Sequence, residues 1–277
     1  MTQNITVKPV SGALGAEVTG IDLSKELDSA ARHAVRQAFL DHHLLVFPGQ
    51  DLSDDDHVRA CEIFGPVQPE RMNPDLADQT KPGVHFVSNT RPDAILPHGD
   101  IVFHMDQVQY ETPCLAMSLY GIEVPSSGGE TLFSNATAAY DALPDATKQR
   151  LASLSGFNCY LYDSPNVLRR VTEREENAPR AIHPVVRTHP ETGRKAIHVS
   201  RLSTDYIVDL DAAESGALLE SLFATLEEDR FVYQHSWRPG DLVIWDNRCV
   251  MHARNDYDSV NQRRLLRRIA VTGDRPF

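Results

Sequence analysis

The chain has 277 residues and carries 27 basic against 39 acidic side chains, which gives a formal net charge of −12. This negative charge argues against binding to nucleic acid or to an anionic membrane surface, because both attract basic proteins. No apolar run approaches the roughly 18 residues that a membrane span needs, and the N-terminus resembles no signal peptide. The four cysteines are scattered without a paired spacing, so we expect reduced thiols in a cytoplasmic protein.

The N-terminal part of the chain is predicted to mix short strands with helices. Hydrophobic spacing and glycine turns predict strands at residues 7–10, 15–20 and 44–47 and a helix over residues 28–42. Ser53 is a typical N-cap, and a second helix should follow it to about residue 64.

Strands dominate the rest of the sequence. They are predicted at residues 101–107, 114–122, 130–134, 185–188, 196–200, 231–237, 241–246 and 264–272, with helices over residues 137–154 and 211–228. This pattern predicts a mainly β protein with flanking helices, folded as a double-stranded β-helix of the jelly-roll, cupin-like type. No repeat or linker divides the chain, so we expect a single domain over residues 1–277. The irregular segments near residues 66–99 and 156–181 are expected to be functional loops or lids.

His104 and Asp106 form a His-X-Asp pair, and His252 ends the downstream run Trp-Asp-Asn-Arg-Cys-Val-Met-His. Two imidazoles and one carboxylate are the ligand set of the facial triad, which holds non-heme Fe(II) and leaves positions open for dioxygen and a chelating co-substrate. If residues 101–107 form a strand, His104 and Asp106 share one face, because side chains alternate along a strand. The pair could also be an ordinary strand pair, with His252 a hydrogen-bonded core histidine.

A basic run, Gln-Arg-Arg-Leu-Leu-Arg-Arg, ends at Arg268. Read as a strand, it places Arg264 and Arg268 on one face. Arg263 and Arg267 then share the opposite face. One pair can face a lumen and bind a carboxylate through the planar guanidinium fork, while the other faces water. The alternation alone leaves open which pair faces inward.

Two further motifs allow either a functional or a structural interpretation. The turn Ser-Ser-Gly-Gly-Glu leads into Thr131, whose hydroxyl could donate to a bound carboxylate, although a threonine is also common in a simple hairpin. Trp245 is expected in the core. Asp246 and Arg248 are expected to brace the end of a strand rather than to take part in chemistry.

Taken together, these motifs and their order resemble one family. The chain is similar to the TauD/TfdA family (taurine and chlorophenoxyacetate dioxygenases) of Fe(II)- and 2-oxoglutarate-dependent enzymes. The runs Leu14-Gly-Ala-Glu-Val-Thr-Gly, Leu45-Val-Phe-Pro-Gly-Gln and Ile63-Phe-Gly-Pro resemble the opening of that family as well. The resemblance therefore covers nearly the whole chain.

The resemblance implies a role for each motif. The implied Fe(II) ligands are His104, Asp106 and His252. Thr131 and Arg264 would hold the distal carboxylate of 2-oxoglutarate, while its keto-acid end chelates the metal. Arg268 matches a position that can meet an anionic group of the substrate. The implied reaction consumes dioxygen and 2-oxoglutarate, releases succinate and carbon dioxide, and hydroxylates a small molecule.

Two departures from the family pattern concern the substrate. Glu70 lies in a stretch where the taurine enzymes carry a histidine that contacts the sulfonate, and Asp100 falls where they have an amide. These differences argue against taurine. They also make Glu70 and Asp100 candidate substrate-binding residues, which opposite Arg268 would suit a zwitterion.

Three functions remain in competition at this point. The main hypothesis is a dioxygenase that hydroxylates a small organic acid, such as an aryloxyalkanoate or a sulfonate. The second is a biosynthetic hydroxylase or desaturase of an amino-acid-like or amine-bearing molecule, and the third is a catalytically silent, metal-dependent sensor. In each case the expected partner is a small anionic or zwitterionic molecule, without nucleic acid or membrane. A homo-oligomer is the general expectation for such a protein.

Overall fold

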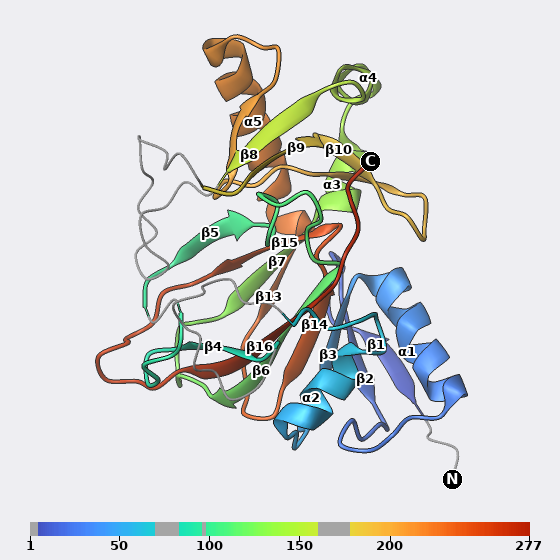
Figure 1. Ribbon diagram of the computed structural model, residues 1–277, viewed down its shortest axis with the longest axis vertical. Helices are drawn as coiled ribbons and strands as arrows, with labels where there is room; N and C mark the ends of the chain where they lie inside the picture. Colours follow the sequence, from blue (N-terminus) through green and yellow to red (C-terminus); the bar gives the residue numbers. More distant parts are fainter. Residues whose placement is uncertain (1–4, 70–82, 96–97, 160–177) are drawn as a thin grey trace.

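The computed structural model describes residues 5–69, 83–95, 98–159 and 178–277, and its architecture is built on two facing β-sheets (Figure 1). The larger sheet has the strand order β1-β2-β3-β14-β6-β16-β4. Its strands are β1 (Thr6–Pro9), β2 (Ala16–Thr19), β3 (Leu44–Phe47), β4 (His85–Ser88), β6 (Ala116–Glu123), β14 (Leu242–Asp246) and β16 (Leu265–Val271). The smaller sheet has the order β13-β7-β15-β5. Its strands are β5 (Ile101–His104), β7 (Thr131–Asn135), β13 (Val232–His235) and β15 (Val250–Arg254).

The connections between strands define a jelly roll. From β5 to β7, and again from β13 to β16, each strand lies in the sheet opposite to that of the strand before it. Such alternation between two sheets is the wiring of a double-stranded β-helix. The fold class predicted from the sequence is therefore confirmed.

Alternation along the strands separates two cores. In β14, Val243 and Trp245 belong to the core between the sheets, whereas Leu242 and Ile244 belong to the core on the outer face of the larger sheet. Burying each such side chain contributes about 1.5–3 kcal/mol, so a shift of register by one residue would exchange both faces at a large cost.

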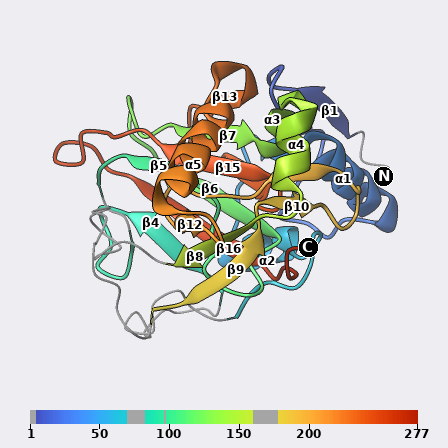
Figure 2. The ribbon, with the colours of Figure 1, turned by 90° about the horizontal axis from the view of Figure 1, so that it is seen from above.

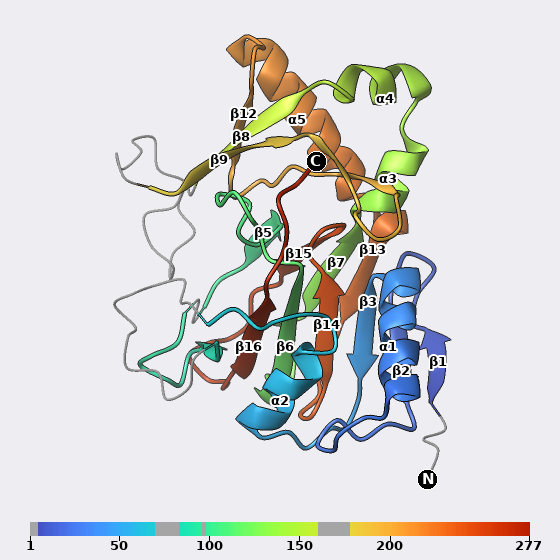
Figure 3. The same ribbon diagram turned by 45° about the vertical axis from the view of Figure 1, so that its right-hand side comes forward.

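Two helices cover the outer face of the larger sheet (Figure 3). Helix α1 (Ser29–His42) is capped by Asp28, whose side chain accepts from a backbone N–H of the first turn. Helix α2 (Asp54–Cys61) begins with a capping box between Ser53 and Asp56. Both predicted helices are confirmed, although α2 ends at Cys61, earlier than the sequence suggested.

A further layer of helices and short strands lies beyond β5 and β15 (Figures 1 and 2). It contains α3 (Ala136–Ala142), α4 (Asp145–Leu151), α5 (Ala212–Leu226), β8 (Ser155–Cys159), β9 (Arg180–Pro184), β10 (Val186–Thr188), β11 (Lys195–Ile197) and β12 (Thr204–Ile207). Leu218, Leu219, Leu222 and Leu226 of α5 are buried and belong to the same continuous hydrophobic cluster as Val243 and Trp245. None of the helices in the described ranges has both the length and the apolar character of a membrane span.

Some predicted elements were wrong, and local chemistry explains why. The predicted helix over residues 137–154 is divided into α3 and α4, because Pro144 has an extended backbone (ψ 146°) and no N–H group to continue a helix. The predicted strand 101–107 ends at His104. The sequence did not predict β12 or β15.

The two segments predicted as lids are partly regular. The first contains β4, which pairs with β16, and the second contains most of β8 and the beginning of β9. Residues 70–82, 96–97 and 160–177 lie outside the described residues. The role of these segments as lids therefore stays a prediction.

Candidate active site

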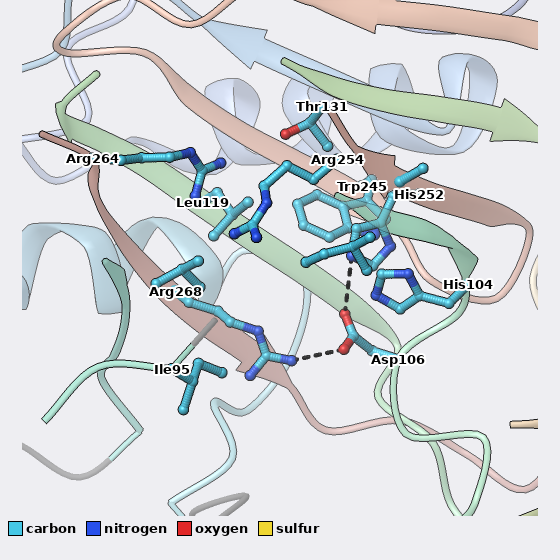
Figure 4. A pocket seen from close by; sticks show the side chains of 13 residues that line it. Ile95, His104, Asp106, Leu119, Thr131, Trp245, His252, Arg254, Arg264 and Arg268 are labelled. Atoms are coloured by element: carbon cyan, nitrogen blue, oxygen red, sulfur yellow. Dashed lines mark hydrogen bonds and ion pairs between the residues drawn. The ribbon is translucent and has the colours of Figure 1, made fainter. Parts of the chain in front are cut away.

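Two histidines meet where β5 pairs with β15. The antiparallel register places His252 directly opposite His104, and the centroids of the two rings are 4.0 Å apart. Directly opposed residues of paired strands point to the same face of a sheet. Both rings line a pocket between the two sheets (Figure 4).

Asp106 reaches these histidines from the turn after β5. Gln107 in this turn adopts a left-handed backbone with φ of 64°. Asn247 holds the turn in place, because Asp106 N donates to Asn247 Oδ1 (3.0 Å) and Asn247 Nδ2 donates to Asp106 O (2.9 Å). The expected shared strand face was therefore wrong, yet the three side chains converge, with their ligand atoms within 4.8 Å of one another. We call His104, Asp106 and His252 the open group.

The open group has the protonation state that a metal ligand set needs. His104 Nδ1 donates to the carbonyl oxygen of Val102 at 2.9 Å, which leaves Nε2 unprotonated. Burial lowers the pKa of both histidines. Burial alone would raise the pKa of Asp106, but the Arg268 guanidinium together with the two neighbouring histidines outweighs burial and holds that pKa below its usual range. Two neutral imidazoles and a carboxylate, whose Oδ2 accepts no hydrogen bond from the described residues, fit a divalent metal ion.

One pair of arginines from the basic run points into the same pocket. Arg264 and Arg268 both line it, Arg264 from the residue just before β16 and Arg268 from the middle of that strand (Figure 4). Arg268 Nη2 donates to Asp106 Oδ1 at 3.0 Å. The structure therefore shows that Arg264 and Arg268 are the inward-facing pair, a choice that the sequence left open.

The other pair lies away from the pocket. Arg263 is exposed and forms an ion pair with Glu123 at 2.7 Å. Arg267 is buried, and donates to His57 Nδ1 (3.1 Å) and to the carbonyl oxygen of Leu52 (2.7 Å). The expectation that the outer pair faces water is therefore correct for Arg263 and wrong for Arg267, because α2 covers that part of the sheet.

Arg264 is buried with donor atoms that lack partners. Its side chain is 2% exposed, and its Nε and Nη1 have no hydrogen-bond partner among the described residues. Burial, and then the neighbouring Arg254, lower the pKa of Arg264, although a guanidinium stays protonated at neutral pH. Thr131 lines the same pocket from β7. A buried cation with unpartnered donors, in the same pocket as a hydroxyl, suits an anion such as a carboxylate.

The remaining walls of the pocket are mostly apolar. They include Val87, Leu119, Ile101 and Trp245. An apolar lining with a few convergent polar groups is typical of a site for a small molecule. Trp245, predicted to be a core residue, is buried and also forms part of this wall, with its ring centroid 4.8 Å from that of His252.

Three residues of this region were missed by the sequence analysis. Asn247 holds the turn of Asp106, Trp237 contacts Thr131, and Arg254 lines the pocket. The signal for Arg254 was present, because it lies two residues after a predicted ligand on one strand. The roles of Asn247 and Trp237 depend on contacts across the chain, which no local pattern displays.

The two predicted substrate residues outside the arginine run gain no support. Asp100 is exposed and is not among the described residues that line the pocket. Glu70 lies outside the described residues.

A second group of similar side chains lies at the end of β14. His189, Asp246 and Cys249 are all buried, with ligand atoms within 4.8 Å of one another. Arg248 donates to both carboxylate oxygens of Asp246 (2.8 and 2.7 Å), and His189 Nε2 lies 3.0 Å from Asp246 Oδ2. Burial raises the pKa of the Cys249 thiol, so it stays protonated. We call these three residues the closed group; as predicted, Asp246 and Arg248 brace a strand end.

A jelly roll with such a pocket is the architecture of a 2-oxoglutarate-dependent dioxygenase, and comparison with known proteins places the chain in that class of oxidoreductase. The chain belongs to the family described as "Taurine catabolism dioxygenase TauD, TfdA family", whose sequence model matches residues 6–270. The family resemblance seen in the motifs is therefore confirmed.

Individual relatives align over almost the entire chain. One relative is the (S)-phenoxypropionate/alpha-ketoglutarate-dioxygenase of Sphingobium herbicidovorans. The two sequences are 30% identical over an alignment of 294 positions, and this alignment covers 99% of this chain and 97% of the relative. It is 32% identical over 295 residues to the alpha-ketoglutarate-dependent 2,4-dichlorophenoxyacetate dioxygenase of Cupriavidus pinatubonensis, covering 98% and 99%. Among solved structures, AAD-2 in complex with Mn(II) and N-oxalylglycine has a TM-score of 0.83 at 29% identity, with 99% of both chains covered.

Proposed function

We propose that the open group binds one Fe(II) ion, that Arg264 and Thr131 bind the distal carboxylate of 2-oxoglutarate, and that the substrate is a small organic acid. The observation that carries this proposal is the buried Arg264 with two unpartnered donor atoms, in the same pocket as the open group. When bound, the iron supplies the activation of dioxygen. The overall reaction converts 2-oxoglutarate, dioxygen and the substrate C–H into succinate, carbon dioxide and the hydroxylated product.

The protein's own residues orient the reactants and control the charge. Asn247 fixes the backbone that presents the Asp106 carboxylate, and Arg268 keeps that carboxylate ionised. The bond from His104 Nδ1 to the backbone keeps its Nε2 available as a ligand. The apolar walls exclude water, which strengthens each of these electrostatic contacts.

An anionic substrate is supported by the charges around the pocket. Arg254, Arg264 and Arg268 all line it, while Asp106 is the one acidic side chain among its described lining residues. A metal dication adds further positive charge, and 2-oxoglutarate brings only two negative charges. The net positive field therefore favours an acid over an amine. The relatives named above for phenoxypropionate and 2,4-dichlorophenoxyacetate support the same class.

The proposal also covers the cellular location, the number of domains and the oligomeric state of the enzyme. The four cysteines are buried and free, which fits the reducing conditions of the cytoplasm. We propose one domain over residues 1–277, acting as a homo-oligomer or alone.

The test is succinate formation by the Fe(II)-loaded protein with 2-oxoglutarate and dioxygen. The panel contains aryloxyalkanoates, sulfonates, sulfate esters and amino acids. We expect one class of acid to stimulate succinate formation well above the rate without substrate. Stimulation by amino acids alone would instead support the biosynthetic alternative. No binding of 2-oxoglutarate to the metal-loaded protein would overturn the proposed roles of the open group and Arg264 together.

A further inference from the structure

Trp237 makes a polar contact that the proposed chemistry does not yet use. It lies between β13 and β14, and its ring is 9% exposed. Its Nε1 donates to Thr131 Oγ1 at 3.0 Å, and the Thr131 side chain is 2% exposed. The contact thus joins two buried side chains at the edge of the pocket.

The chemistry of the two groups fixes the direction of this hydrogen bond. An indole N–H can only donate, whereas a threonine hydroxyl has one hydrogen to donate and lone pairs to accept. The bond from Trp237 therefore occupies a lone pair of Thr131 and leaves the hydroxyl hydrogen for another acceptor. No acceptor for it is found in the described part of the chain, and Thr131 lines the pocket. The hydroxyl hydrogen is thus available to a ligand.

The ring of Trp237 is held from several sides. His235 packs edge-on against it, with ring centroids 4.7 Å apart and an interplanar angle of 87°. Asp241 lies 3.2 Å from His235 Nε2 and also accepts from the backbone N–H of Arg238 (3.0 Å). Gly121 lets the backbone that follows the indole approach β6, since a Cβ there would lie 3.0 Å from the carbonyl oxygen of Arg238. The indole N–H is therefore a fixed donor.

We propose that Trp237 is a positioning residue that commits the Thr131 hydroxyl to donate to the distal carboxylate of 2-oxoglutarate. This inference rests on the proposed function, in which Thr131 and Arg264 bind that carboxylate. With Trp237 in place, the subsite offers only donors: the Thr131 O–H and the Nε and Nη1 of Arg264. Such a site accepts a carboxylate and disfavours groups that must themselves donate, such as an amide.

The experiment measures 2-oxoglutarate affinity for the Mn(II)-loaded protein without dioxygen, by calorimetric titration. A double-mutant cycle uses Trp237→Phe, Thr131→Val and their combination. We expect Thr131→Val to weaken binding by roughly tenfold or more, and Trp237→Phe by roughly threefold to fivefold. In the Thr131→Val background, Trp237→Phe should change the affinity by less than about twofold, because its target hydroxyl is already absent.

A second ligand separates positioning from packing. 2-Oxopentanoate keeps the keto acid and the chain length but has a methyl group in place of the distal carboxylate. Trp237→Phe should leave its affinity unchanged, whereas a general disturbance of the fold would weaken both ligands. Ser134→Ala is the matched control, because it removes another buried hydroxyl of β7, bonded to the carbonyl oxygen of Leu226 and away from the pocket. It should not change 2-oxoglutarate affinity.

The possible results distinguish a failure of the proposed carboxylate site from a failure of the positioning role of Trp237. If Thr131→Val leaves 2-oxoglutarate affinity unchanged, the proposed carboxylate site itself is wrong. If Thr131→Val weakens binding but Trp237→Phe has no effect, or has an equal effect in both backgrounds, the positioning role is wrong. Should Trp237→Phe fail to fold, Trp237→Met also removes the N–H donor and gives the same comparison, with thermal unfolding as the check.

Discussion

The open group and the closed group each combine a histidine and an aspartate with a third potential ligand, which is His252 in the open group and Cys249 in the closed group. In each group the ligand atoms lie within 4.8 Å of one another. In the closed group, both oxygens of Asp246 accept from Arg248, and His189 lies against one of them. In the open group, Arg268 bonds one oxygen of Asp106, while the other accepts no hydrogen bond from the described residues.

This contrast shows that residue types and their proximity alone do not mark a metal site. The third member of the closed group, Cys249, has its pKa raised by burial, so it is a thiol and a poor ligand. The same contrast holds for the arginines, because Arg248 also bonds Glu191 (2.7 Å), while Arg264 keeps unpartnered donors. A group with its hydrogen bonds complete stabilises the fold, and a group with free ligand atoms beside a pocket can bind.

The largest effect is expected when a proposed metal ligand of the open group is removed. Asp106→Ala should abolish metal binding and substrate-stimulated succinate formation, because two imidazoles alone do not complete the triad. Metal content of the purified protein and succinate release measure this. Cys249→Ala, the matched change in the closed group, should keep one metal ion per chain. Unchanged metal content in the Asp106 variant would refute the proposed ligand set.

Breaking the closed group should instead cost stability. Asp246→Ala leaves the buried Arg248 without its bidentate partner, and we expect a loss of about 3–5 kcal/mol in the free energy of unfolding. Urea unfolding measures the loss, and metal binding by the folded fraction should persist. A variant that loses the metal at unchanged stability would show that the closed group is itself the metal site.

A smaller effect is expected when Arg264 is replaced, because this residue contacts the co-substrate and not the metal in the proposed site. Arg264→Ala should raise the 2-oxoglutarate KM by tenfold or more, since a hydrogen-bonded contact to a charged group is worth about 1.5–3 kcal/mol. The KM for the primary substrate should change far less, as initial rates with each reactant varied will show. If only the substrate KM rises, Arg264 binds the substrate instead of the co-substrate.

The smallest effect concerns pH. Burial would raise the pKa of Asp246, but its bonds to Arg248 and His189 outweigh burial and place that pKa well below the ordinary value. The stability this contributes is present above a pH of about 3.9 and is lost as pH falls below it, with a slope of at most about 1.4 kcal/mol per pH unit. Asp246→Asn should flatten the pH dependence of unfolding between about pH 4 and pH 2. Identical slopes for the two proteins would contradict this origin of acid sensitivity.

Much of the fold could be read from local chemistry. Ser53 with Asp56 marks the start of α2, and alternation along β16 and the two residues before it separates Arg264 and Arg268 from Arg263 and Arg267. These features depend on neighbours in the chain, so the sequence displays them. Pro144 also carried its signal, which the predicted helix over residues 137–154 overlooked.

The site was only partly predictable, because several of its contacts join residues that are far apart in the chain. The jelly-roll pattern and the candidate ligands could be inferred from the amino-acid sequence, because alternation and spacing are local properties. Three contacts became visible only in the folded chain: His252 lies opposite His104, Asn247 holds the turn that presents Asp106, and Trp237 donates to Thr131. Those contacts join residues more than a hundred positions apart. They depend on the register between strands and on the order of the sheets, which the packing of the whole chain sets.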